Sequence, residues 1–156
     1  MFLVTHAAIG AIIGEKTGNP VLAVLVGFAF HFISDMIPHG DSQVYAEFKK
    51  GKAVRQAIAY VMVDAVAAIM FVLLLFNFRD FLHPASVSAG IAGSLLPDLL
   101  VGLCEFKSLK SRWLAKFHGI HFYFHNMITS RKRDLSFRAG FAMQLILLAL
   151  LQIRVF

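Results

Sequence analysis

The sequence contains very little cysteine and little charge. Its single cysteine, Cys104, excludes an intramolecular disulfide framework and a cysteine-rich zinc cluster. Charged residues make up only 15% of the chain, whereas hydrophobic residues make up 58%. Soluble domains are roughly half apolar, so this composition predicts an integral membrane protein. The chain also lacks a serine or cysteine motif that would indicate a covalent nucleophile.

The net charge of +6 does not by itself indicate a nucleic-acid partner, because the basic residues lie between apolar runs. An anionic membrane surface is the simpler partner, so we expect contact with membrane lipid and its anionic head groups, and none with nucleic acid. No lysine or arginine precedes the first apolar run, and no clear small-residue cleavage site follows it. We therefore expect this run to be a retained helix rather than a signal peptide.

Five apolar runs and one mixed segment predict an all-α membrane bundle that forms a single domain over residues 1–156. The apolar runs cover about 2–13, 20–38, 53–76, 84–104 and 139–155. The spacing of Gly10 and Gly14 in the first run favours close helix packing. Residues 107–124 mix basic and aromatic side chains, which is typical of an interfacial helix. The sequence leaves the oligomeric state open.

The basic residues predict the orientation of this bundle. Four basic residues follow the second run, and eight lie between the fourth and fifth runs. If each apolar run spans the membrane once, these two loops share one side, which then holds 12 of the 15 lysine and arginine residues. Basic loops stay in the cytoplasm, which predicts a multi-pass protein of the inner (plasma) membrane. The residues on that side are Lys49, Lys50, Lys52, Arg55, Lys107, Lys110, Arg112, Lys116, Arg131, Lys132, Arg133 and Arg138.

Histidines and aspartates gather toward the same predicted side. His31 and Asp35 are four residues apart and share one helix face. Asp64 is the exception, because it lies about 11 residues into its run and therefore near mid-membrane. The other candidates converge on the cytoplasmic face. The candidate metal ligands are His6, His31, Asp35, His39, Asp64, Asp98, His118, His121 and His125.

Divalent metal ions explain this gathering in physical terms. An unpaired aspartate in hydrocarbon costs roughly 2.5–3.5 kcal/mol on insertion scales, and a divalent cation offsets that cost for several carboxylates together. Imidazole nitrogen and carboxylate oxygen are the usual mixed ligands of zinc, iron or manganese. One tetrahedral zinc takes about four ligands, so this set predicts two or more ions, with zinc as the expected metal.

Several short motifs stand out: Thr5-His6 with Gly10, the segments 31–35 (HFISD) and 38–41 (PHGD), and Pro97-Asp98. Together they resemble a known family, the membrane-bound metal-dependent hydrolases of bacteria and archaea. The H-x-x-x-D segment is also similar to a ligand segment of zinc-dependent phospholipase C and related zinc nucleases. That similarity implies a metal-bridging role for Asp35. The later histidine spacing departs from those enzymes, so it does not imply their trinuclear cluster.

The leading hypothesis is a membrane-bound metal-dependent hydrolase that cleaves a phosphoester of a lipid with metal-activated water. Asp35 and Asp98 are the expected catalytic residues, and Lys116 or Arg131 is expected to hold a phosphate group. The mid-membrane Asp64 favours an alternative, a divalent-metal transporter or channel. A third possibility is a non-enzymatic membrane protein in which metal only joins helices.

Each candidate ligand also has a purely structural interpretation. His6 could form a hydrogen bond between helices, and His31 with Asp35 could be a buried ion pair. Asp98 could rebuild a helical turn beside Pro97. Within the 118–125 stripe, at least one histidine could have no ligand role, and His121, at its centre, is the preferred ligand.

Overall fold

The computed structural model describes residues 1–105, 111–129 and 134–155, and within these residues it contains seven α-helices and no strand. This confirms the all-α prediction. The helices are α1 (Leu3–Thr17), α2 (Pro20–Asp35), α3 (Ser42–Lys49), α4 (Val54–Phe78), α5 (Pro84–Glu105), α6 (Arg112–Thr129) and α7 (Phe137–Val155). Helix α3 lies between the second and third apolar runs, where no helix was expected.

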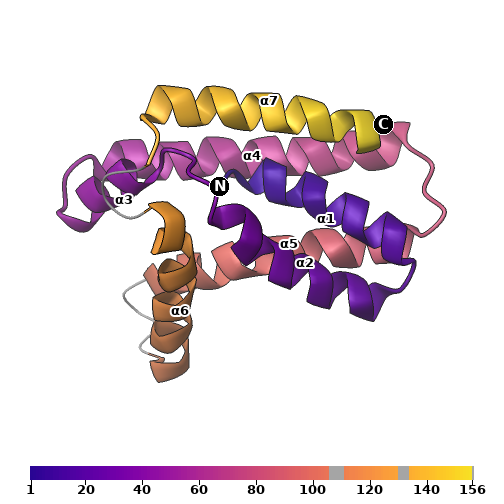
Figure 1. Cartoon of the computed structure of the whole chain (residues 1–156), viewed down its shortest axis with the longest axis horizontal. Helices are drawn as coiled ribbons and strands as arrows, with labels where there is room; N and C mark the ends of the chain where they lie inside the picture. Colours follow the sequence, from indigo (N-terminus) through magenta and orange to yellow (C-terminus); the bar gives the residue numbers. More distant parts are fainter. Residues whose placement is uncertain (106–110, 130–133, 156) are drawn as a thin grey trace.

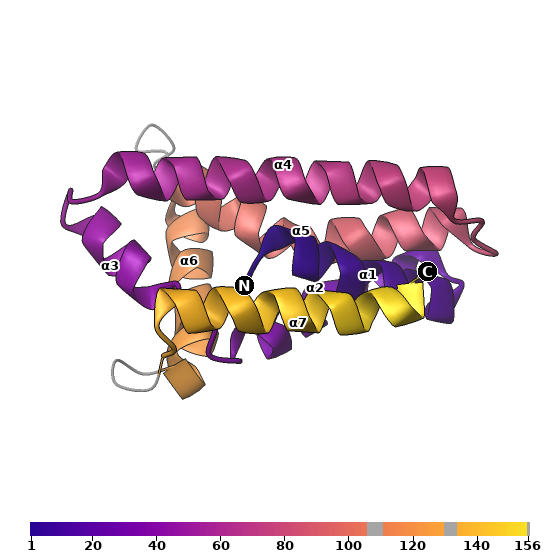
Figure 2. The same ribbon diagram turned by 90° about the horizontal axis from the view of Figure 1, so that it is seen from above.

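Helices α1, α2, α4, α5 and α7 lie along roughly the same axis, and α6 runs across one end of them (Figure 1). Helix α1 lies among α2, α4, α5 and α7 and packs against all four. From above, α4 and α7 lie on opposite sides of α1 (Figure 2). Helix α3 lies at the same end as α6, near the beginning of α4. This end of the bundle carries most of the polar side chains discussed below.

A tight link between α1 and α2 brings the start of one helix beside the end of the other. Gly18 ends α1 in the left-handed region, with φ of 58°, and donates its N–H to the Gly14 carbonyl oxygen. Asn19 then accepts the Leu22 N–H at 3.0 Å, and Pro20 occupies the first turn of α2. The two helices therefore run antiparallel, and His6 near the start of α1 comes close to the end of α2.

Small residues let α1 and α5 approach closely. A Cβ atom added to Gly14 would lie 2.2 Å from the Ser86 carbonyl oxygen, and one added to Gly10 would lie 2.5 Å from that of Gly90. Real Cβ atoms do not approach backbone this closely, so larger residues would push the helices apart. This crossing fixes how α5 lies beside α1, and α5 carries Asp98.

Two helices, α4 and α5, are long and apolar enough to cross a membrane. Helix α2 and the part of α7 over Phe137–Gln152 are apolar but shorter. Helix α1 has 15 residues, which gives about 22 Å at ~1.5 Å per residue, against a hydrocarbon core of about 30 Å. The structure therefore supports two of the five predicted spans by length and composition. The predicted interfacial segment forms α6, and residues 107–110 of it lie outside the described residues.

Candidate metal centre

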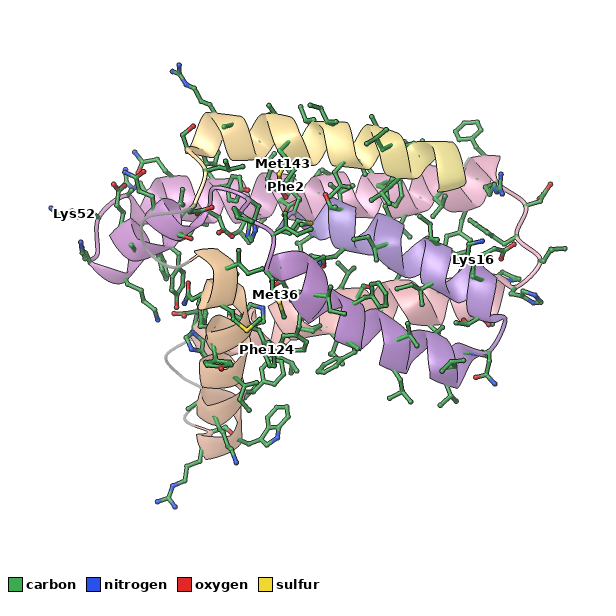
Figure 3. All side chains as sticks on the ribbon, in the orientation of Figure 1. Phe2, Lys16, Met36, Lys52, Phe124 and Met143 are labelled. Atoms are coloured by element: carbon green, nitrogen blue, oxygen red, sulfur yellow. The ribbon has the colours of Figure 1, made fainter. Side chains whose placement is uncertain are left out.

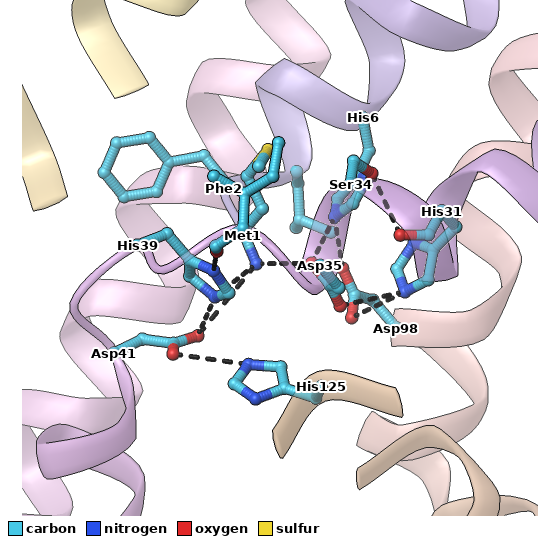
Figure 4. Close-up of polar contacts among 12 residues, drawn as sticks. Met1, Phe2, His6, His31, Ser34, Asp35, His39, Asp41, Asp98 and His125 are labelled. Atoms are coloured by element: carbon cyan, nitrogen blue, oxygen red, sulfur yellow. Dashed lines mark hydrogen bonds and ion pairs between the residues drawn. The ribbon is translucent and has the colours of Figure 1, made fainter. Parts of the chain in front are cut away.

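Histidine and aspartate side chains from four helices and one link meet at the end of the bundle that α6 crosses (Figure 4). They form two groups of potential metal ligands among the described residues. The first group comprises His31, Asp35, Asp98 and His121, and the second comprises His39, Asp41 and His125. His6 of α1 lies against the first group.

The atoms of the first group have the spacing of a tetrahedral zinc shell. His31 Nε2 lies 3.2 Å and His121 Nε2 lies 3.4 Å from Asp35 Oδ2, and the two nitrogens are 3.1 Å apart. Each nitrogen lies 3.7 Å from Asp98 Oδ1. Four ligands held at 2.0–2.1 Å from a zinc ion are about 3.3 Å apart at tetrahedral angles. One ion could therefore contact all four side chains with little movement.

The other ring nitrogen of His31 supports this interpretation. His31 Nδ1 lies 2.8 Å from the Ser94 carbonyl oxygen, to which it can only donate. In the neutral ring, Nε2 then carries a lone pair that faces the lone pairs of Asp35 Oδ2. This oxygen is buried and receives no hydrogen bond of good geometry. Acceptors facing one another at this distance need a proton or a cation between them, and metal-binding histidines commonly have their other nitrogen fixed in this way.

His6 gives the two aspartates a second set of neighbours. Its Nε2 lies 3.1 Å from Asp35 Oδ1 and 3.8 Å from Asp98 Oδ2, while its Nδ1 lies 3.3 Å from Ser34 Oγ. The other oxygens of Asp35 and Asp98 face His31, as described above. Each carboxylate thus has one oxygen toward His6 and one toward the first group, and Asp35 Oδ1 also accepts a hydrogen bond from the Met1 amine at 2.7 Å.

The second group lies on the link between α2 and α3 and on α6. His39 Nε2 is 2.9 Å from Asp41 Oδ2, and His125 Nε2 is 3.3 Å from Asp41 Oδ1. His39 Nδ1 donates to the Ile37 carbonyl oxygen at 2.6 Å, so its Nε2 is again the nitrogen that faces the carboxylate. Burial alone would raise the pKa of Asp41, but the close contacts with His125 and His39 and the charge of the Met1 amine hold it well below its usual value.

The Met1 amine lies between the two groups (Figure 4). Its nitrogen is 2.7 Å from Asp35 Oδ1 and 2.8 Å from His39 Nε2, and 4.0 Å from Asp41 Oδ2. Burial would lower the pKa of this amine, but the charges of Asp35, Asp41 and Asp98 raise it to about 10. The three carboxylates therefore favour the protonated, positively charged form of the Met1 amine.

Besides His6, two predicted ligands lie outside both groups. His118 Nε2 lies 2.8 Å from Glu105 Oε1 and 3.1 Å from the Tyr45 hydroxyl, in a cluster that joins α3, α5 and α6. Asp64 Oδ2 accepts the main-chain N–H of Leu3 at 2.8 Å, at the start of α1.

The two residues expected to hold phosphate are not positioned at the groups by the structure. Lys116 is exposed. About 100° of rotation per residue puts it well away from the face of α6 that carries His121. Arg131 lies outside the described residues.

The sequence analysis missed Asp41 as a ligand and missed the residues that hold its loop. Asp41 is two positions from His39, a spacing that could have been noticed. Asp134 accepts the N–H groups of Gly40 at 2.8 Å and Ser42 at 3.1 Å, and Gln144 of α7 donates to the His39 carbonyl oxygen at 3.3 Å. Such long-range supports leave no local pattern in a sequence.

No protein-family model, curated protein or solved structure matches this chain. The two groups combine neutral nitrogen and anionic oxygen donors, offer shared carboxylates, and stay partly open to solvent, since the Asp98 and Asp41 side chains are 24% and 29% exposed. Such a site can bind divalent ions and still admit a substrate.

Proposed function

We propose that this protein is a membrane-bound metal-dependent hydrolase that cleaves a phosphoester of a lipid. The observation that carries the proposal is the tetrahedral spacing of His31, Asp35, Asp98 and His121, together with the divided carboxylates of Asp35 and Asp98. Phosphoester hydrolysis is one of the reactions that two neighbouring metal ions catalyse. Divalent ions bound there, with zinc favoured by the donor set, would polarise the phosphoryl oxygens and activate water.

The residues of the chain have different parts in this reaction. The Asp35 side chain is 1% exposed, which suits a carboxylate that bridges ions and never contacts substrate. Asp98 and Asp41 are the more exposed carboxylates, so their open sides are where a phosphate group would approach. Ser94 and Ile37 keep the rings of His31 and His39 oriented through their carbonyl oxygens. Lys116 lies away from the ligand groups, so of the two residues expected to bind phosphate only Arg131 remains a candidate.

The surface of α4 supports a location in the membrane. Val63 is 70% and Ile69 is 60% exposed, and apolar side chains project along most of this helix. A continuous apolar surface of this length would be unfavourable in water. Lys52 and Lys16 lie at opposite ends of the bundle (Figure 3), and Lys49, Lys50 and Arg55 are close to Lys52 in the sequence. The bias favours a multi-pass inner-membrane protein whose site faces the cytoplasm.

The proposal is tested by measuring metal content and lipid hydrolysis on the same protein in nanodiscs. We expect stoichiometric transition metal after purification without chelator, and metal-dependent release of phosphate or phosphorylated headgroup from phospholipid. His31→Ala should lose both, whereas His83→Ala, at the far end of the bundle, should lose neither. Bound metal without turnover of any phosphoester would indicate a structural metal. Metal uptake into liposomes without turnover would indicate a transporter.

A further inference from the structure

Helix α6 has an exposed face that no described residue covers. At about 100° of rotation per residue, six exposed side chains fall within an arc of about 100°. We name these six residues the outer face of α6. They are Arg112, Trp113, Lys116, Ile120, Tyr123 and Met127. Trp113 is 61%, Ile120 44%, Tyr123 68% and Met127 53% exposed.

The chemistry of the outer face fits the headgroup layer of a membrane. Tryptophan and tyrosine concentrate at membrane–water interfaces, because their rings are apolar while their N–H and O–H groups stay hydrated. Arg112 and Lys116 lie among these apolar side chains. Cations beside an apolar stripe are the features that attract a helix to anionic lipid. A soluble protein partner would not require interfacial aromatic residues together with cations beside an apolar stripe.

The orientation of α6 points to the same partner. The helix runs transverse to α4 and α5, the two helices able to cross a membrane, and crosses the end of the bundle (Figure 1). If α4 and α5 run along the membrane normal, α6 runs along the membrane plane. Its opposite face is buried and carries His121 and His125, which are 3% and 6% exposed. The depth of α6 therefore sets the depth of both ligand groups.

We propose that the outer face of α6 binds the headgroup layer of an anionic bilayer and so holds the two His/Asp groups at the level of the lipid phosphates. The inference rests on the membrane location proposed above and is independent of whether metal binds. A helix with ligands on one face and lipid on the other would present the site to phosphates at the membrane surface rather than to soluble phosphoesters.

Trp113 gives a direct test, because it is the only tryptophan in the chain. The full-length protein is reconstituted in nanodiscs that contain phosphatidylglycerol and a lipid brominated either near the glycerol or near the chain ends. We expect Trp113 fluorescence to be quenched more strongly by the shallow bromines than by the deep ones. Lys116→Glu should reduce the shallow quenching in anionic discs and have a smaller effect in purely zwitterionic ones.

A control separates this inference from the membrane proposal. Val63 of α4 is 70% exposed, so Val63→Trp in a Trp113→Phe background reports on the proposed span. Quenching of that probe by deep bromines, with Trp113 quenched only by aqueous iodide, would overturn the inference and leave the membrane location intact. Protection of Trp113 from both lipid and iodide, together with a crosslinked dimer, would also overturn it in favour of a second copy. No lipid quenching at either position would refute the membrane location itself.

Discussion

Asp64 of α4 accepts the main-chain N–H of Leu3 at 2.8 Å, so a carboxylate inside an apolar helix caps the start of another helix. Phe2, the residue before α1, supplies no side-chain hydrogen bond to that helix. The first turn of α1 leaves N–H groups without partners in the helix, and Asp64 satisfies one of them. This contact gives the most unusual residue of the sequence a structural role, and His6 lies one turn further along α1.

The Asp64 contact predicts a difference between two substitutions. Asp64→Asn keeps an oxygen that can accept the Leu3 N–H, so metal content and hydrolysis should be close to wild type. Asp64→Leu leaves that N–H buried without a partner and should lower the free energy of unfolding by about 1–3 kcal/mol. Thermal unfolding in detergent and metal analysis measure the two effects. If Asp64→Asn abolished metal flux in liposomes, Asp64 would lie on an ion path and the transporter would be favoured.

The three histidines of α6 should differ in their effect on metal binding. His121→Ala and His125→Ala should each lower the metal content, because these rings face Asp35 and Asp41. His118→Ala should leave the metal content unchanged, because His118 pairs with Glu105. Metal-to-protein ratios of the three variants, purified side by side, show which of these histidines bind metal. Loss of metal in His118→Ala would mean that α6 sits differently against α3 and α5.

Local spacing was sufficient for part of this site. His31 and Asp35 are four residues apart on one helix, and the structure brings them together as that spacing requires. Spacing alone could not show which of the three histidines of α6 face a candidate metal site. Spacing defines a face of a helix but does not say which neighbour lies opposite each position along it. Here His121 meets Asp35, whereas His118, one turn earlier, meets Glu105.

Other parts of the site depend on contacts that are distant in sequence. His6 and Asp98 come together only because Gly10 and Gly14 allow α1 to approach α5. The five-span model treated every apolar run alike. Helix α1 begins beside Asp64, partway along α4, and its 15 residues give about 22 Å at ~1.5 Å per residue, which is less than a hydrocarbon core of about 30 Å. Hydropathy finds apolar runs, but it does not report where one helix starts relative to another.

The crossing of α1 and α5 predicts unequal effects for two glycine substitutions. A Cβ on Gly14 would lie 2.2 Å from the Ser86 carbonyl oxygen, whereas one on Gly102 would meet nothing within 4 Å. Gly14→Ala should therefore destabilise the fold by about 1–3 kcal/mol through overpacking. Gly102→Ala should be neutral or stabilising by up to about 1 kcal/mol, because alanine favours a helix. Comparable unfolding temperatures for the two variants would argue against this crossing.

The two ligand groups should lose metal separately. Asp41→Asn removes the charge shared by His39 and His125 and should remove the metal of the second group, leaving that of the first. Asp134→Asn is the milder comparison, because it weakens the hold on the Gly40 and Ser42 N–H groups without touching a ligand. It should lower metal affinity at the second group with a smaller loss of content. Simultaneous loss of all metal in Asp41→Asn would mean that the groups form one cooperative centre.

Substitutions of Asp35 separate a role in hydrolysis from a role in folding. Its two oxygens face His6 and His31, so Asp35→Asn keeps the size of the side chain but removes the charge that balances two cations. We expect nearly complete loss of hydrolysis, together with reduced metal content. Asp35→Leu removes the ligand oxygens as well and should also destabilise the fold, since it leaves neighbouring buried histidines without their partner. Folding of both variants is checked by thermal unfolding, and hydrolysis and metal uptake are measured on the same reconstituted preparations. Full hydrolysis by Asp35→Asn would contradict a bridging role. Metal flux that falls in both variants, with no phosphoester turnover in the wild type, would identify a transporter instead.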